Sequence, residues 1–351
     1  MKSVLVLVVL VCISCVRTPT APEEGSGRID VGGTWVICEG LWRQNNAALS
    51  YVQPSGAVVR DAMRYVNGIN IGDTPSDVLV GGDTLIIAVN TSQKILFLSK
   101  STGMLLATIS TPPGKEPYRL ARYGNKLWCT NLNDDSITEI DIPTGTISVA
   151  SAPVGPAPEG IVVADSMMYV ALSGFGDLRK NEPRAGSVLV LHIRDLSVQD
   201  SIVNLPNVGA LVADQQRHLL WCAFRNYAST PDVPGGVLLF DTQTNTELQR
   251  WVFNSPTRIC TDTVTGNAFI LHTNGVDMLI PGISTSQHIL EHKSTAANDV
   301  WYSLGYDNVN QHLFVGNARS YVTDGELLVY TLSGQLVDRY PVGSNPTCIV
   351  K

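Results

Sequence analysis

The sequence is poor in charge and has no surplus of basic residues. Charged residues make up 16% of its 351 residues, and the net charge is −7. A protein that binds nucleic acid needs clustered lysines and arginines to neutralise phosphates, so we expect no nucleic-acid partner. Apolar residues make up 44% of the chain, which is enough to build a buried core.

Sequence motifs of catalytic and metal sites are missing as well. The five cysteines beyond Cys15 form no CxxC pair, and the chain contains no GxSxG and no HExxH. These are the patterns of zinc sites, serine hydrolases and zinc proteases. The six histidines show no ligand spacing. His288 and His292 fall in one expected strand, where they would stand roughly 13 Å apart, too far for one metal. We therefore expect no metal, no cofactor and no catalytic residue.

The first residues form a targeting segment. Lys2 precedes an unbroken apolar run over residues 4–11, which is too short to span a bilayer as a helix and is typical of a signal peptide. No other apolar stretch is long enough to span a membrane.

Ser14 stands directly before Cys15, a pattern that resembles the lipobox of bacterial lipoproteins, in which the cysteine carries a lipid. We expect residues 1–14 to be a signal peptide and residues 15–32, rich in Pro, Gly, Thr and Glu, to form a lipidated, flexible tether. The alternative is an ordinary secretory signal that is cleaved near this point.

The strongest signal is a repeat of short apolar strands. Its clearest copy covers residues 74–109, where four short segments joined by turns predict a four-stranded meander. A large residue recurs in the second strand of each unit at intervals of roughly 40–50 residues, the period of propeller blades. Six of these seven markers are aromatic, although aromatic residues are only 7% of the chain. The markers are Trp35, Ile86, Trp128, Tyr169, Trp221, Phe269 and Phe314.

The two ends of the repeat complete each other. The unit at Trp35 has no first strand of its own, whereas residues 342–350 resemble the stretch that opens the other units. The C-terminal strand therefore supplies the inner strand of the first blade and removes an exposed sheet edge. We predict an all-β fold: a seven-bladed β-propeller of four-stranded antiparallel blades over residues 33–351, with almost no helix.

Five cysteines follow Cys15, and most lie inside apolar strand patterns. Cys129, Cys222 and Cys260 are expected to be buried thiols. Ring closure places Cys38 and Cys348 on adjacent strands of one blade, where the strand register decides between a disulfide and two free thiols. We favour two free thiols.

The units resemble the YVTN/YncE-like propeller family. The marks are residues 127–131, 136–141, 143–145 and 158–161. Residues 40–51 and 71–77 are similar to a branch of lipid-anchored surface propellers that includes the BtuG-type cobalamin-binding lipoproteins. The resemblance implies an outer-membrane lipoprotein, at the cell surface or on the periplasmic face. It also implies a corrinoid-like ligand and a TonB-dependent outer-membrane transporter as partner.

In a propeller, the loops between second and third strands and the loops that enter each blade open on one face. This face is the natural ligand site of the scaffold. Its expected loops carry amides, arginines and aromatic residues, which suit a large ligand with flat apolar surface and amide or hydroxyl groups. For each residue alone, turn chemistry or packing at the blade rim is the alternative. The candidates are Trp42, Asn45, Asn46, Asp73, Asn90, Tyr118, Arg119, Asn131, Glu159, Phe175, Arg225, Tyr227, Arg258, His272, Trp301 and Asn317.

Two of these loops are long, at residues 173–186 and 224–235, in consecutive units. They would build a wall or lid on one side of the face, or they are neutral surface insertions.

The resulting functional hypothesis is a monomeric, non-enzymatic lipoprotein that captures a small molecule, with a corrinoid as the specific guess, for a TonB-dependent transporter. The first alternative is a module that binds another envelope protein. The second is a propeller enzyme, because some proteins with this fold are lyases or lactonases whose metal or histidine cluster comes from separate blades.

Overall fold

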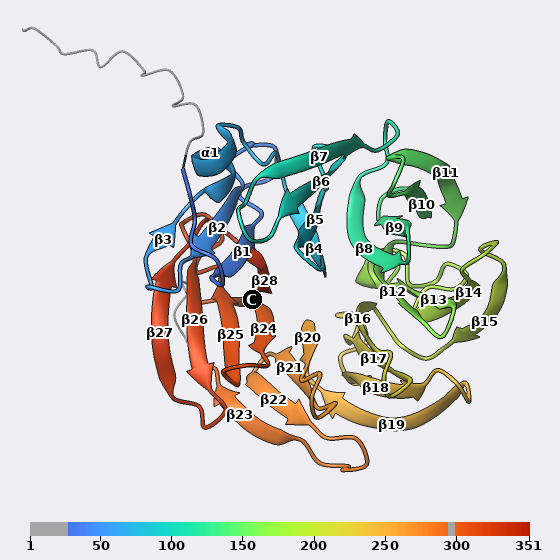
Figure 1. The fold of residues 1–351 in the computed structure, drawn as a ribbon. Helices are drawn as coiled ribbons and strands as arrows, with labels where there is room; N and C mark the ends of the chain where they lie inside the picture. The colour runs from blue at the N-terminus through green and yellow to red at the C-terminus, as the bar shows by residue number, and fades with distance from the viewer. Residues whose placement is uncertain (1–26, 294–298) are drawn as a thin grey trace, which may run out of the picture.

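The computed structural model describes residues 27–293 and 299–351. Cys15 and the signal peptide lie outside the described residues. The described chain forms seven four-stranded antiparallel sheets arranged as a ring around a central axis (Figure 1). This confirms the predicted all-β, seven-bladed propeller.

Six blades are built from four consecutive strands each, counted from the axis outwards. Blade 2 contains β4 (Pro75–Gly81), β5 (Thr84–Val89), β6 (Lys94–Ser99) and β7 (Leu105–Ser110). Blade 3 contains β8 (Pro117–Tyr123), β9 (Lys126–Asn131), β10 (Ser136–Asp141) and β11 (Thr146–Pro153). Blade 4 contains β12 (Pro158–Ala164), β13 (Met167–Leu172), β14 (Ser187–His192) and β15 (Val198–Ile202).

The remaining three of these blades follow the same order. Blade 5 contains β16 (Val208–Asp214), β17 (Leu219–Phe224), β18 (Gly235–Asp241) and β19 (Thr246–Phe253). Blade 6 contains β20 (Arg258–Thr261), β21 (Ala268–His272), β22 (Gly275–Leu279) and β23 (Gln287–Glu291). Blade 7 contains β24 (Trp301–Asp307), β25 (His312–Asn317), β26 (Glu326–Thr331) and β27 (Leu336–Pro341).

Blade 1 joins the two ends of the chain. Its strands from the axis outwards are β28 (Pro346–Val350), β1 (Thr34–Cys38), β2 (Ala48–Val52) and β3 (Val58–Val59). β28 runs antiparallel to β1, with Trp35 opposite Val350 and Val36 opposite Ile349. The predicted ring closure by the C-terminal strand is therefore confirmed.

A short helix, α1 (Ala62–Asn67), follows the two-residue strand β3 and was not expected from the sequence. Asp61 accepts a hydrogen bond from the Arg64 amide at its start, and Gly68 adopts a left-handed conformation at its end. One helical turn and a half is too short to produce a detectable 3.6-residue period. The segment from Gly27 also contacts this blade: the Gly27 amide donates to the Tyr65 carbonyl, and Ile29 is buried.

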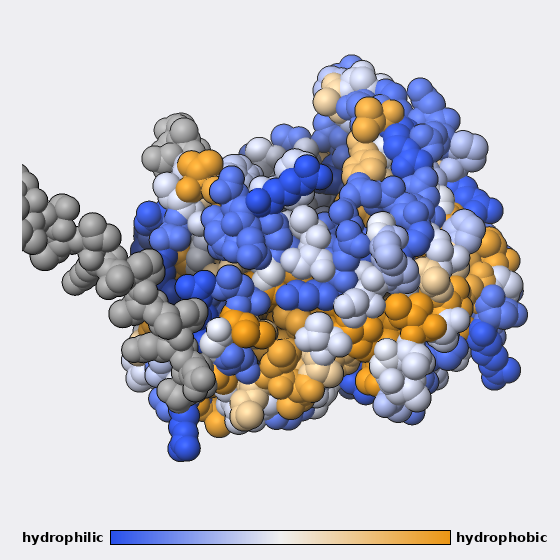
Figure 2. All heavy atoms as spheres, turned by 90° about the horizontal axis from the view of Figure 1, so that it is seen from above, coloured by the Kyte–Doolittle hydropathy of each residue, from blue (hydrophilic) through white to orange (hydrophobic). Residues whose placement is uncertain are grey.

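The seven marker residues all lie in the core. Each is at most 5% exposed, and each packs in the apolar layers between neighbouring blades. Seen from its edge, the ring shows a band of apolar residues across its middle, between hydrophilic residues above and below (Figure 2). No helix in the described ranges has the length and hydropathy of a membrane span.

Cys38 and Cys348 are free thiols, as favoured from the sequence. The register sets Ile37 opposite Cys348 and Cys38 opposite Pro346. Cys38 packs in the layer between blades 7 and 1, whereas Cys348 packs in the layer between blades 1 and 2. Burial raises the pKa of Cys38 to about 12, so this thiol stays protonated at neutral pH.

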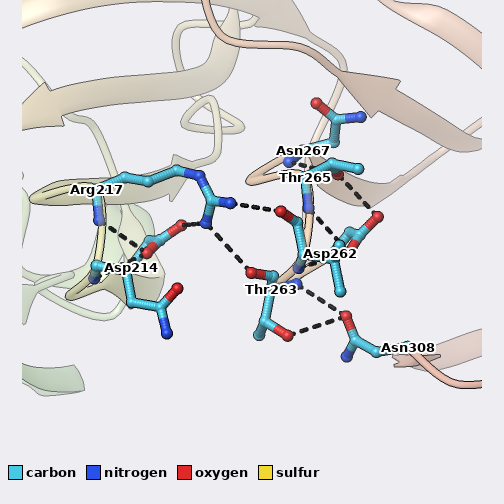
Figure 3. Close-up of polar contacts among 9 residues, drawn as sticks. Asp214, Arg217, Asp262, Thr263, Thr265, Asn267 and Asn308 are labelled. Carbon is cyan, nitrogen blue, oxygen red and sulfur yellow. Dashed lines mark hydrogen bonds and ion pairs between the residues drawn. The ribbon is translucent and has the colours of Figure 1, made fainter.

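The turns between first and second strands lie on the face opposite the long loops. Three of them join blades 5, 6 and 7 through a chain of polar contacts (Figure 3). The Arg217 guanidinium pairs with Asp214 at 2.7 Å and donates to the carbonyls of Thr263 and Val264. The Thr263 amide in turn donates to Asn308 Oδ1 at 2.8 Å. Successive blades are thus held together at this face by hydrogen bonds as well as by their apolar layers.

Two equivalent tryptophans allow a test of a buried polar contact. Trp128 Nε1 donates to Glu139 Oε2 at 2.8 Å, and Glu139 is 4% exposed. Trp221 Nε1 is buried without a hydrogen-bond partner among the described residues. Because both replacements remove the same ring, Trp128→Phe should lower the free energy of unfolding by about 1.5 kcal/mol or more beyond Trp221→Phe at pH 7, measured by urea denaturation.

At acidic pH, the difference in unfolding free energy between Trp128→Phe and Trp221→Phe should become smaller. Burial acts to raise the pKa of Glu139, but hydrogen bonds from Lys126, Ser148 and Trp128 outweigh it and lower the pKa. A carboxylate with a lowered folded pKa stabilises the protein above its unfolded pKa, and this stabilisation is lost as pH falls through the folded pKa. Equal destabilisation by both variants at pH 7 would contradict the assigned hydrogen bond.

Candidate functional site

A polar cavity of about 290 Å³ lies on the propeller axis, among the inner strands. Its charged lining consists of Asp77 on β4, Arg119 on β8, Glu159 on β12, Arg258 on β20 and Arg225, which directly follows β17. Four of these five residues were predicted from the sequence as ligand-binding. Three arginines face two carboxylates here, so the lining is locally positive in a protein with a net charge of −7.

A repeated backbone irregularity places polar residues at the mouth of the cavity. The pairing between inner and second strand shifts register near the first residues of the inner strand in six blades. Such a β-bulge adds a residue, bends the strand and redirects its side chains. Arg119 and Glu159 both lie within these shifts, between Pro117 and Leu120 and between Pro158 and Ile161. Blade 6 is regular at this point, with Arg258 opposite Leu271.

Asp77 and Arg119 form a buried ion pair between blades 2 and 3. Arg119 Nη1 lies 3.7 Å from Asp77 Oδ1, and both side chains are only 19% exposed. The Leu120 amide donates to Asp77 Oδ2 at 2.8 Å. Burial raises the pKa of Asp77, and the charge of Arg119 acts in the opposite direction. The Arg119 guanidinium also lies 4.6 Å from the centre of the Tyr118 ring.

Arg225 joins blades 4 and 5 at the same cavity. Its Nη2 donates to Asn207 Oδ1 at 3.1 Å and lies 3.5 Å from Glu159 Oε1. Gly209 makes this arrangement feasible, because a Cβ at that position would overlap the Glu159 carboxylate. Arg225 therefore remains anchored to a carboxylate on one side while it faces the cavity on the other.

Of the three arginines, Arg258 has the fewest hydrogen-bond and ion-pair partners among the described residues. Its Nη1 donates to the Thr257 carbonyl at 3.1 Å, while its buried Nε has no hydrogen-bond partner among the described residues. The guanidinium lies 5.4 Å from the centre of the Tyr302 ring, and the Tyr302 hydroxyl donates to Glu39 Oε2 at 2.9 Å. Burial raises the pKa of Tyr302, so it remains a hydrogen-bond donor at neutral pH. The Thr347 hydroxyl, on β28 in the same lining, is also buried without a partner in the described chain.

The two long loops contact each other above blades 4 and 5. Asp177 accepts hydrogen bonds from the amides of Ala228 at 2.7 Å and Ser229 at 3.2 Å. Lys180 lies 5.5 Å from the centre of the Tyr227 ring. Phe175 belongs to the first loop, at the start of a short 3₁₀ turn. The two loops are therefore joined to each other on the side of blades 4 and 5, and among their residues only Arg225 lines the cavity.

Most of the predicted asparagines and Asp73 hold loops and strand ends rather than line the cavity. Asp73 accepts from the amides of Arg43 and Asn45, and Asn46 accepts from the Leu41 amide. Asn90 donates to the carbonyls of Glu116 and Pro117. Buried Asn131 donates to Ser136 and Thr138. Trp42 is exposed on the loop face, with the Arg43 guanidinium 4.2 Å from its ring centre.

Trp301 and Asn317 belong to a second pocket, of about 360 Å³, in blade 7. There Glu326 pairs with Arg319 at 2.7 Å and with Arg339 at 3.1 Å. The remaining candidate, His272, lies in blade 6 beside Asp277. The structure therefore separates the sixteen candidates into a central group, loop-holding residues, the exposed Trp42, the long-loop residues Phe175 and Tyr227, and two peripheral groups.

Asp77 and Thr347 are cavity residues that the sequence analysis missed. Both follow a proline at the start of an inner strand, as Pro75-Ser76-Asp77 and Pro346-Thr347. Arg119 and Glu159 follow Pro117 and Pro158 in the same way. The polar residue after this repeated proline was the signal that could have found them.

The outer rim carries a groove of about 860 Å³ between β7 and β11, lined by both apolar and polar residues. Leu106 and Ile109 line it from β7, and Ile142 and Ile147 line it from blade 3. Leu106 is 59% exposed. The apolar band in the edge view of the ring is consistent with such a surface (Figure 2).

Comparisons with known proteins support the fold. No family model matches the sequence, and no curated protein matches it. A quinoprotein alcohol dehydrogenase-like protein from Bacteroides thetaiotaomicron superposes with a TM-score of 0.69 at 11% identity, over 93% of this chain and 79% of its own. Apo AztD from Citrobacter koseri superposes with a TM-score of 0.54 at 12% identity, over 90% of this chain and 96% of its own. BamB from Moraxella catarrhalis superposes with a TM-score of 0.50 at 14% identity, over 91% of this chain and 85% of its own. At these identities the likeness shows that this chain shares the seven-bladed β-propeller fold of these proteins, and nothing further.

Proposed function

We propose that this protein binds a small molecule at the central cavity, without catalysis, as a lipid-anchored protein of a bacterial envelope. The observation that carries the proposal is the pair of unpartnered buried polar groups, Arg258 Nε and the Thr347 hydroxyl, in one cavity lined by three arginines. Buried polar groups are nearly always hydrogen-bonded, so two such groups in one concave site favour a ligand that supplies the partners.

The lining favours a ligand rich in acceptors. Guanidinium groups donate to carboxylate, phosphate and amide oxygens, while Asp77 and Glu159 accept from amide or hydroxyl hydrogens. The cavity, of about 290 Å³, is at the lower end of ligand-site volumes. A corrinoid is larger than this cavity, so its ring would lie on the loop face beside the long loops of residues 173–186 and 224–235. Its amide and phosphate groups would reach the arginines.

Within this proposal, the corrinoid is the specific ligand, and a TonB-dependent outer-membrane transporter is the partner that receives it. Both come from the likeness of residues 40–51 and 71–77 to the BtuG-type branch. The loop face suits transfer, because its exposed Trp42 and the aromatic residues of the long loops offer flat surfaces near the cavity mouth.

Replacement of Arg258 tests the site. Titration calorimetry of the purified protein with cyanocobalamin should give one binding site, and Arg258→Ala should weaken it at least about tenfold, or about 1.4 kcal/mol. The fold should survive, because the guanidinium donates to one carbonyl only. Arg122→Ala is the matched control, since Arg122 is an exposed arginine on β8 that donates to Gly124.

Two outcomes would count against the proposal. Unchanged affinity in Arg258→Ala would place the ligand outside the central cavity. An absence of binding by the unaltered protein would remove the corrinoid as ligand.

The rim groove favours a second candidate function, binding of another envelope protein. Exposed apolar residues within a groove are typical of a protein-interaction surface, and Leu106 is such a residue here. Leu106→Asp should leave corrinoid affinity unchanged if the central cavity is the ligand site. Loss of corrinoid binding in Leu106→Asp alone would move the ligand to the rim.

The lipid anchor is tested at the cysteine itself. Cys15→Ser should move the protein from the membrane fraction to the soluble fraction, because the lipid on Cys15 is its only proposed membrane contact. Thr18→Ser is the control, since Thr18 lies in the expected tether beyond the lipobox and should leave the fractionation unchanged. Membrane association of Cys15→Ser equal to that of the unaltered protein would contradict the anchor. Protease added to intact cells separates a cell-surface location from a periplasmic one.

A further inference from the structure

Blade 6 brings two histidines and an aspartate together, away from the central cavity. His272 Nε2 lies 3.1 Å from Asp277 Oδ1, and His288 Nδ1 lies 2.7 Å from the same oxygen. All three ligand atoms lie within 4.8 Å of one another. The spacing of these residues along the chain gives no sign of the cluster, because it depends on how three strands pair.

The strand pairing of β21, β22 and β23 creates the cluster. Asp277 stands directly opposite His288, and a register shift between Val276 and Asp277 adjusts this pairing. His272 ends β21, opposite Gly275, which starts β22 with a φ of 137°. A Cβ on Gly275 would overlap the Leu290 carbonyl, so this tight hairpin requires glycine. The backbone therefore fixes all three side chains on one blade.

We propose that His272, Asp277 and His288 form a binding site for a divalent transition-metal ion, with Zn²⁺ as the preferred ion. Two imidazoles and one carboxylate are a common set of three protein ligands for zinc. Ligands about 2.0–2.1 Å from a tetrahedral ion stand about 3.3 Å apart. The observed separations of 2.7 and 3.1 Å are shorter than this value, so the carboxylate and the imidazoles would have to move slightly apart to admit an ion. Imidazole ligands also discriminate against Mg²⁺ and Ca²⁺, which prefer oxygen.

The surroundings of the cluster support metal binding. Ser286 Oγ donates to Asp277 Oδ2 at 2.5 Å, so this carboxylate is oriented by its second oxygen while Oδ1 faces both histidines.

The burial of the ligands indicates how an ion would reach the site. The side chains of His272 and Asp277 are 7% and 10% exposed, whereas His288 is 48% exposed. The His272 ring packs against Phe253 of blade 5, with ring centres 5.0 Å apart. Two ligands are thus held rigidly, and the third stands at the solvent edge. An ion would keep its fourth position open on the His288 side.

In the absence of a metal, the same atoms can form a hydrogen-bonded group. Each histidine would donate to Asp277, and the Asn274 amide lies 3.4 Å from His272 Nδ1. A metal ion at His272 Nε2 would move the imidazole proton from Nε2 to Nδ1. Nδ1 could then no longer accept the weak hydrogen bond from the Asn274 amide. The hydrogen-bonded group and the metal site use the same atoms, so a measurement of Zn²⁺ binding distinguishes them.

The test is a Zn²⁺ titration of the purified protein after treatment with a chelator. The unaltered protein should bind one equivalent, measured by calorimetry and by metal analysis after dialysis. His288→Ala should weaken binding at least tenfold. The variant should stay folded because His288 is half-exposed on β23, and circular dichroism checks this. His312→Ala is the control, because His312 starts β25 in the next blade.

Two further measurements strengthen the test. Ser286→Ala should weaken Zn²⁺ binding about tenfold by removing the group that orients Asp277. Co²⁺ should give visible absorption of a nitrogen and oxygen site in the unaltered protein and lose it in His288→Ala. Equal Zn²⁺ binding by the unaltered protein and His288→Ala, or no binding by either, would overturn the proposal and leave a hydrogen-bonded group. Because the site shares no residue with the central cavity, its failure would leave the proposed function untouched.

Discussion

The pairing of β28 with β1 is the contact on which the rest of the molecule depends. It joins the two ends of the described chain and completes blade 1, so that β1 is paired on both sides, with β28 and with β2. Val350 and Cys348 contribute to the apolar layer between blades 1 and 2, and Ile349 contributes to the layer between blades 7 and 1. The same strand brings Thr347 to the central cavity. The cavity is therefore a property of the closed ring and of no single blade.

Ring closure places seven inner strands around one axis. A charged side chain there loses hydration, which destabilises the fold unless the charge is paired. Asp77 pairs with Arg119 at 3.7 Å, and Glu159 lies 3.5 Å from Arg225. Each pair links neighbouring blades, so the charges bind the ring together while they line the cavity. A hydrophobic lining would serve stability as well or better, because buried ion pairs rarely outweigh the loss of hydration. The cavity is nevertheless lined by charged residues, and Arg258 Nε has no partner in the described chain. These two features favour a binding role.

The fold could be predicted from the sequence almost completely, and the site only in part. Because the unit recurs along the chain, its pattern could be recognised. The pattern predicted the buried markers, such as Trp128 and Tyr169, and showed that the first unit lacks its first strand. Helix α1 was not, because six residues cannot establish a period. Arg119, Glu159 and Arg258 were visible as polar residues near blade entries, and Arg225 as a residue of a long loop after a second strand. Asp77 and Thr347 were missed because they fall where the pattern was interpreted as apolar inner strand.

The two candidate sites differ in how they depend on the fold. The central cavity takes residues from all seven blades, so its geometry requires the whole ring. The group of His272, Asp277 and His288 comes from one blade and depends on strand register and on packing against Phe253. Sequence spacing reveals neither arrangement, since each rests on contacts between strands. A closed ring therefore supports a shared site at its axis and leaves each blade free to carry a local site of its own.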